Sequence, residues 1–159
     1  MKKIIPILII ALFSMQSCKK SDDMLTPAEQ LEIDIQLIED FIALNNLDAQ
    51  RTNSGLHYVI TEEGRSEDYP TLQDKVKVHY KGFYIGSGAI FDETEDNEPL
   101  TILLSNTIDG WREGIPYFNK GAKGMLLIPS GLAYGPYPPP GVQANAVMVF
   151  EIELLDFFQ

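Results

Sequence analysis

The apolar side chains change their spacing once along this chain, and that change limits the folds it can adopt. Before residue 46 they recur at helical intervals, whereas from residue 54 onward they alternate with polar side chains, as in strands. The clearest alternation is in Lys75–Lys81, where two Val residues and Tyr80 point to one face and the Lys and His residues to the other. One helix followed by many short strands predicts an α+β protein.

The predicted helix begins at a strong capping signal and ends at Asn45–Asn46. Thr26 serves as N-cap, Pro27 suits the first helical position, and Glu29 completes a capping box. Its apolar side chains form two adjacent rows: Leu31, Ile35, Ile38 and Ile42 in the first, and Ile33, Leu37, Phe41 and Leu44 in the second. We favour a helix docked on its own domain. The alternative is that one row docks while the other meets a second copy, which would give a homodimer through residues 28–45.

The rest of the chain is predicted to form an antiparallel sheet with a short helix on one face. The helix is expected over 110–118, limited in length by Pro116. The expected strands cover 56–60, 75–81, 89–91, 100–104, 125–128 and 146–157.

The first residues have the features of a targeting segment. Lys2 and Lys3 precede an apolar run that is too short to span a bilayer, and small residues then lead to Cys18, the only Cys. We therefore expect a lipoprotein signal peptide over 1–17, with an ordinary signal peptide as the alternative. Cys18 would be lipidated and would hold the protein on the outer membrane of a bacterial cell envelope, on its periplasmic or its cell-surface side.

Composition excludes several functions. A formal net charge of −11 argues against a nucleic-acid partner, which needs Lys and Arg to neutralise phosphates. No metal site or other cofactor is predicted, because neither His57 nor His79 has a second ligand at metal spacing. The acidic run 92–98 lacks the spacing of a calcium loop, and no Gly-x-Ser-x-Gly motif supports a nucleophile. Aromatic residues remain, and from composition alone they are best explained as core: Tyr80, Phe91, Trp111, Tyr134 and Phe150.

Five motifs, taken in series, resemble the FKBP family of peptidyl-prolyl isomerases, and their order and spacing agree over about residues 70–157. They are V-x-V-H-Y-x-G, F-D, I-x-G-W-x-E-G, a stretch ending in A-Y-G, and a closing strand, at Val76–Gly82, Phe91–Asp92, Ile108–Gly114, Gly124–Gly135 and Asn145–Leu155. The short gap between Pro99 and Trp111 is closest to the macrophage-infectivity-potentiator-like bacterial branch. Residues 26–64 resemble the N-terminal extension of secreted members.

The resemblance implies a twisted antiparallel sheet wrapped around a short helix, with a shallow apolar pocket between them. It divides the chain into a signal peptide (1–17), a lipidated Cys and tether (18–25), a helix with a leading strand (26–64) and an isomerase domain (65–159). It also implies catalysis of X–Pro rotation in exported, proline-containing proteins, and binding of macrolides of the rapamycin type.

The resemblance also assigns roles to individual residues. Trp111 would be the pocket floor, and the Ile108 N–H and the Tyr134 hydroxyl would hold substrate carbonyls. The walls would be Tyr80, Phe91 and Phe150, and Asp92 would polarise one edge. Three further pocket positions depart from the family pattern: Leu100, Thr107 and Val142. That altered rim leaves an alternative function open, a non-catalytic binding module or holdase for proline-containing or apolar segments.

Overall fold

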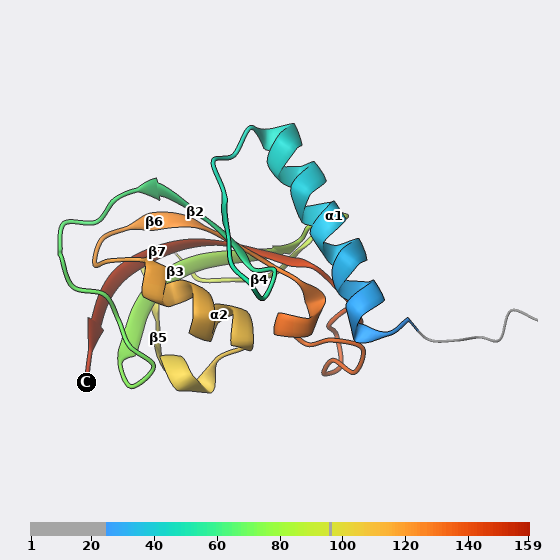
Figure 1. Cartoon of the computed structure of the whole chain (residues 1–159). Helices are drawn as coiled ribbons and strands as arrows, with labels where there is room; N and C mark the ends of the chain where they lie inside the picture. Colours follow the sequence, from blue (N-terminus) through green and yellow to red (C-terminus); the bar gives the residue numbers. More distant parts are fainter. Residues whose placement is uncertain (1–24, 96) are drawn as a thin grey trace, which may run out of the picture.

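A computed structural model describes residues 25–95 and 97–159 (Figure 1). The predicted signal peptide over 1–17, Cys18 and most of the predicted tether lie outside the described residues. The fold is the predicted α+β arrangement, in which an antiparallel sheet curves around a short helix.

Seven strands form one sheet in the order β1-β2-β6-β7-β3-β4, and β5 also pairs with β3. Their bounds are β1 Gln50–Arg51, β2 His57–Glu62, β3 Lys75–Tyr84, β4 Ile90–Glu93, β5 Leu100–Leu103, β6 Lys123–Ile128 and β7 Met148–Phe158. Six were expected from the sequence. β1 was missed, because a two-residue strand is too short to show an alternation.

The long strand β3 lies between β7 and the two short strands β4 and β5. It pairs with β7 from Lys75↔Phe158 to Tyr84↔Met148, and its other edge is shared by β5 and then β4. Between those two short strands, Thr94 pairs with Tyr80 of β3. The Thr94 N–H donates to the Tyr80 carbonyl at 3.0 Å, and Thr94 Oγ1 accepts from the Tyr80 N–H at 3.1 Å. The backbone of Tyr80 is therefore held on both sides.

The short helix α2 (Asp109–Gly114) packs against one face of the sheet and continues as a 3-10 turn over Ile115–Tyr117. The predicted helix over 110–118 is thus present, with Pro116 in its tighter final turn. The core between α2 and the sheet contains fully buried side chains from both. They include Val76, Val78, Ile115, Phe118, Leu126, Ile128 and Leu154.

The N-terminal helix α1 (Pro27–Asn45) begins with the predicted capping box and ends at Asn46, whose φ of 51° is left-handed. It lies across the face of the sheet opposite to α2, so each face of the sheet carries one helix (Figure 1). Its contacts there centre on Ile38, which is fully buried against Val59, Leu127 and Val149.

The two predicted rows of α1 are divided differently by the structure. The first row faces the domain, as the docked interpretation predicts, but Phe41 of the second row also packs against the sheet. Ile33, Leu37 and Leu44 stay exposed on the outer side of the helix. The homodimer through this helix therefore stays a prediction.

The sheet crosses the predicted boundary between residues 64 and 65. β2 pairs with β6 from His57↔Leu127 to Glu62↔Lys123, so the leading strand belongs to the same sheet as the strands that follow. Ser54, just before β2, donates a hydrogen bond to the Glu113 carboxylate of α2 at 2.8 Å. In the described part of the chain, no helix is both long and apolar enough to cross a membrane.

Candidate active site

All ten residues predicted for the site line one open pocket of about 720 Å³ between α2, β3–β5 and the loop before β7. They are Tyr80, Phe91, Asp92, Leu100, Thr107, Ile108, Trp111, Tyr134, Val142 and Phe150. We call this hollow the aromatic pocket. Four further lining residues were missed, of which Ile102 could have been found from its alternation with Leu100; the others are Asn106, Pro140 and Gly141.

Ring contacts build the pocket around Trp111. The centroid of its indole lies 5.3 Å from those of Tyr80 and Phe150, with ring planes at 87° and 82°. Phe91 meets Phe150 at 5.5 Å and 80°. Such edge-to-face pairs are favourable because the positive edge of one ring meets the negative face of another. Trp111 is 5% exposed, and its Nε1–H has no hydrogen-bond partner among the described residues, so its position depends on packing.

One polar pair lies at the edge of the rings. The Tyr80 hydroxyl donates to the Asp92 carboxylate over 2.5 Å. Burial, followed by this hydrogen bond and the Asp92 charge, raises the pKa of the Tyr80 phenol above its usual range. Tyr80 therefore stays neutral at physiological pH and orients the exposed carboxylate of Asp92 at the pocket edge.

The segment before α2 contributes Thr107 and Ile108 to the lining of the pocket. Arg112 Nη1 donates to the Thr107 carbonyl at 3.1 Å, and Thr107 Oγ1 donates to the Leu104 carbonyl at 2.7 Å, so the peptide that leads into Ile108 is fixed. Within the described residues, the Ile108 N–H donates to no protein acceptor. Arg112, which also pairs with Asp109, was not predicted as part of this support.

The opposite rim is formed by the loop between β6 and β7. Tyr134 is 42% exposed there, and its hydroxyl has no hydrogen-bond partner in the part of the chain that is described. Val142 donates from its N–H to the Pro139 carbonyl at 3.2 Å, and the next residue, Gln143, donates to the Tyr84 hydroxyl at 3.2 Å. Tyr84 thus anchors the rim from β3, a role that the sequence did not reveal.

Gly82 leaves room for two of the pocket walls. A Cβ on Gly82 would lie 2.6 Å from Phe91 Cζ and 3.0 Å from Phe150 Cε1. Gly82→Ala should therefore displace both rings and destabilise the fold by about 1–3 kcal/mol. Denaturant unfolding measures the effect.

Gly86→Ala is the matched control for that change, since nothing lies within 4 Å of a Cβ at Gly86 on the same hairpin. Equal stability of Gly82→Ala and Gly86→Ala would contradict the close packing at Gly82.

The described residues contain no group of three or more His, Cys, Asp or Glu side chains that could hold a metal ion. His79 contacts Thr94 Oγ1 at 3.1 Å, and His57 contacts the Gly55 carbonyl at 3.0 Å. Both His residues thus have structural partners within the fold.

A curved antiparallel sheet around a short helix, with an aromatic pocket floored by Trp111, defines a class of FKBP-like domains. A family model for FKBP-type peptidyl-prolyl cis-trans isomerases matches residues 66–155. The chain belongs to that family, as the five sequence motifs indicated.

Curated relatives agree with this assignment. The chain is 41% identical over 107 residues to the FKBP-type peptidyl-prolyl cis-trans isomerase FkpA of Buchnera aphidicola from Schizaphis graminum, covering 67% of this chain and 42% of the relative. FkpA of Escherichia coli K12 is 40% identical over 105 residues, which cover 66% of this chain and 38% of that relative. The chain thus spans about two fifths of the length of these relatives.

Solved structures support the same fold. The crystal structure of FkpA from Escherichia coli matches with a TM-score of 0.69 and 35% identity, over 80% of this chain and 62% of that one. A peptidyl-prolyl cis-trans isomerase from Pseudomonas syringae matches with a TM-score of 0.72 and 27% identity, over 87% of this chain and all of that one. The second match extends well beyond residues 66–155.

Proposed function

We propose that this chain is a peptidyl-prolyl cis-trans isomerase that accelerates rotation about X–Pro bonds in exported proteins. The observation that carries the proposal is the convergence of ten residues, from segments far apart in the sequence, on one pocket over Trp111. Family membership adds to this support.

The chemistry of the reaction suits an apolar pocket. Rotation about an X–Pro bond has a barrier of about 20 kcal/mol, which arises from amide resonance. In the twisted transition state that resonance is lost, so the carbonyl dipole falls and the proline nitrogen gains lone-pair character. A pocket of aromatic rings excludes water and favours this less polar state over the planar amide, and binding the transition state more tightly than the substrate is what accelerates a reaction.

Two hydrogen-bond donors are available to hold the substrate on either side of the rings. Ile108 and Tyr134 both line the pocket, and neither the Ile108 N–H nor the Tyr134 hydroxyl has a hydrogen-bond partner among the described residues. We propose that they bind the carbonyls that flank the rotating bond. Asp92, oriented by Tyr80, supplies negative potential at the edge of the pocket.

The substrates of this proposal are exposed proline-containing segments, and macrolides of the rapamycin type would compete for the same pocket. Leu100, Thr107 and Val142 line its outer parts, where they would set the preference for residues around the proline.

An isomerase assay on a proline peptide tests the proposal. The purified chain should accelerate cis-trans exchange, seen as NMR exchange peaks or in a protease-coupled assay, and rapamycin should slow it. If the folded chain does not accelerate the exchange at all, the proposal is wrong and the pocket serves binding alone.

We further propose that the protein is a lipoprotein of the bacterial cell envelope, in the macrophage-infectivity-potentiator-like branch of the family. The support is the sequence of residues 1–18, with its apolar run and lone Cys18. Residues 18–25 would then be the tether, residues 26–64 an extension and residues 65–159 the isomerase domain. The anchor would place the pocket at the outer membrane, among exported proteins.

Cys18→Ser should abolish lipidation. In a bacterial host fed a clickable palmitate analogue, the wild-type chain should carry the label and sediment with membranes, because several acyl chains anchor a protein stably. Cys18→Ser should lose both properties, whereas Ser21→Ala, just beyond the proposed cleavage site, should keep them. A wild-type chain without label would exclude the anchor.

A further inference from the structure

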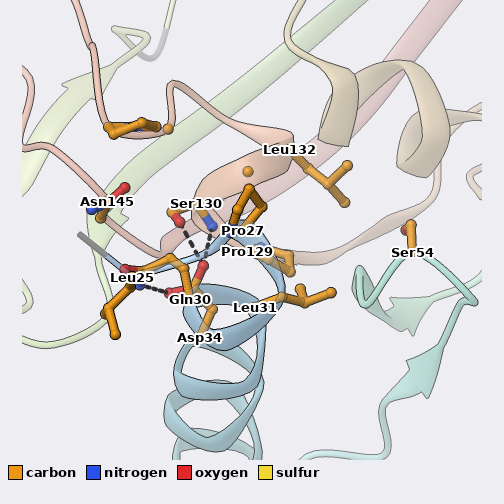
Figure 2. A pocket seen from close by; sticks show the side chains of 13 residues that line it. Leu25, Pro27, Gln30, Leu31, Asp34, Ser54, Pro129, Ser130, Leu132 and Asn145 are labelled. Carbon is orange, nitrogen blue, oxygen red and sulfur yellow. Dashed lines mark hydrogen bonds between the residues drawn. The ribbon is translucent and has the colours of Figure 1, made fainter. Parts of the chain in front are cut away.

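A second cavity of about 460 Å³ lies between the start of α1 and the loop that carries Tyr134 (Figure 2). From α1 its lining includes Pro27, Leu31 and Asp34, and from the loop it includes Ser130 and Gly135. The same loop therefore separates this cavity from the aromatic pocket, because Tyr134 and Val142 line the pocket side.

Asp34 is the polar centre of this region. Its side chain is 1% exposed, and Oδ2 accepts hydrogen bonds from the Ser130 backbone N–H at 2.8 Å and from Ser130 Oγ at 2.6 Å. Oδ1 accepts from Gln30 Nε2 at 2.7 Å (Figure 2). A buried carboxyl group is costly unless it is hydrogen-bonded, and all three bonds of Asp34 are 2.8 Å or shorter. The bonds of Asp34 are therefore strong constraints on Ser130.

Ser130 in turn fixes the backbone of the turn that contains Tyr134. Its carbonyl accepts from the Ala133 N–H at 3.1 Å and from the Gly135 N–H at 2.9 Å, which are the two neighbours of Tyr134. Gly135 has a φ of 59° and its carbonyl accepts from the Asn145 N–H at 2.9 Å, which closes the base of the loop. Both the N–H and the hydroxyl of Ser130 are thus held by Asp34, while its carbonyl holds the backbone around Tyr134.

Docking of α1 does not itself require this carboxylate. Ile38, with Phe41 and Ile42, already packs the helix on the sheet, whereas Asp34 bonds to the loop. Asp34 also takes part in no salt bridge within the described residues. Its bonds outside its own helix thus all go to the residue that organises the Tyr134 turn.

We propose that Asp34 is a positioning residue for isomerisation: from a helix outside the family-matched residues 66–155, it holds Ser130 and thereby sets the place of Tyr134 at the rim of the aromatic pocket. The inference rests on the proposed function, in which the Tyr134 hydroxyl binds a substrate carbonyl. According to this proposal, α1 contributes to catalysis, because a residue of the extension positions a side chain of the aromatic pocket.

Asp34→Ala in the whole chain tests the proposal, with Asp40→Ala on the exposed side of the same helix as matched control. Amide hydrogen exchange at Ala133 and Gly135 should speed up in Asp34→Ala by about tenfold or more, as expected for loss of two buried hydrogen bonds, and should not change in Asp40→Ala. kcat/KM for a proline peptide should fall by about tenfold through the loss of Tyr134 placement, with no change in the control.

A Tyr134→Phe background separates positioning from general damage. If Asp34 acts through the Tyr134 hydroxyl, Asp34→Ala should lower kcat/KM little further in that background, whereas a loss of stability would persist. An equal loss of activity in both backgrounds would overturn the proposal, as would unchanged exchange at Ala133 and Gly135. Should Asp34→Ala not fold, Ser130→Ala is the second test, because it removes only the hydroxyl bond to Asp34. Its kcat/KM should fall by about threefold, and this loss should likewise disappear in the Tyr134→Phe background.

These readouts keep the two proposals distinct. If the wild-type chain shows no isomerase activity, the proposed function fails, while hydrogen exchange at the Tyr134 turn still decides whether Asp34 holds it. If the wild-type chain is active and Asp34→Ala matches it in kcat/KM, the positioning role alone is refuted.

Discussion

Trp111→Ala should abolish most of the isomerase activity, lowering kcat/KM for a proline peptide by about 30- to 150-fold. The indole lines the aromatic pocket and contacts the rings of both Tyr80 and Phe150. Losing a large apolar contact removes about 2–3 kcal/mol of binding to the twisted peptide, which corresponds to that fold-change. The change should also destabilise the fold by about 3–5 kcal/mol, because the side chain is 95% buried.

The loss of activity must be separated from the loss of stability. Trp111→Leu fills most of the volume of the indole but has no aromatic surface. It should therefore be more stable than Trp111→Ala and should still have a lowered kcat/KM. Tyr137→Ala, which removes an 81% exposed ring from the rim loop outside the pocket, is the control and should remain active. Each variant is assayed at a temperature well below its unfolding midpoint, which circular dichroism measures. The activities of folded proteins are then compared.

The same variants decide between catalysis and simple binding. In a holdase, suppression of client aggregation would survive Trp111→Ala and the wild-type chain would show no turnover. An isomerase acting through the aromatic pocket requires turnover in the wild type and its loss in Trp111→Ala. Full activity in a folded Trp111→Ala protein would exclude the proposed pocket chemistry.

Gly124→Ala should strongly destabilise the chain, by more than about 3 kcal/mol. A Cβ on Gly124 would lie 1.9 Å from the Val59 carbonyl oxygen, where β2 pairs with β6. Backbone cannot move aside as a flexible side chain can, so the pairing of the two strands must break or shift. Chemical denaturation of both proteins measures the change.

Gly131→Ala is the matched control for Gly124→Ala, because nothing lies within 4 Å of a Cβ there and its effect should be within about 0.5 kcal/mol. The comparison also tests whether β2, which precedes the family-matched residues 66–155, is an integral part of the sheet. Near-equal stability of Gly124→Ala and Gly131→Ala would show that the pairing of β2 adds little.

The local features of the chain could be predicted because their causes lie within a few residues. The capping box at Thr26 joins residues three positions apart, and the alternation in β3 places Val76 and Val78 on the buried face. Motif order singled out ten residues as members of the predicted site, although they lie far apart in the sequence. All ten then line one pocket.

The supports of the site could not be predicted in this way. Asp34 and Ser130 are 96 residues apart, and Ser54 and Glu113 are 59 apart, so no local spacing relates either pair. In the sequence, Asp34 resembles Asp40 on the same helix, yet one is buried against the loop and the other exposed. Tyr84 as an anchor of the rim was missed for the same reason.

The sequence by itself determined most of the helix and strand segments, where α1 begins, and ten of the fourteen residues that line the pocket. Only the tertiary structure decided that α1 covers the second face of the sheet, that β2 completes the sheet, and that Asp34 holds the loop of Tyr134. The physical reason is range: helix caps and strand alternation depend on neighbouring residues, whereas a buried carboxylate finds its partners only after separate elements have packed together.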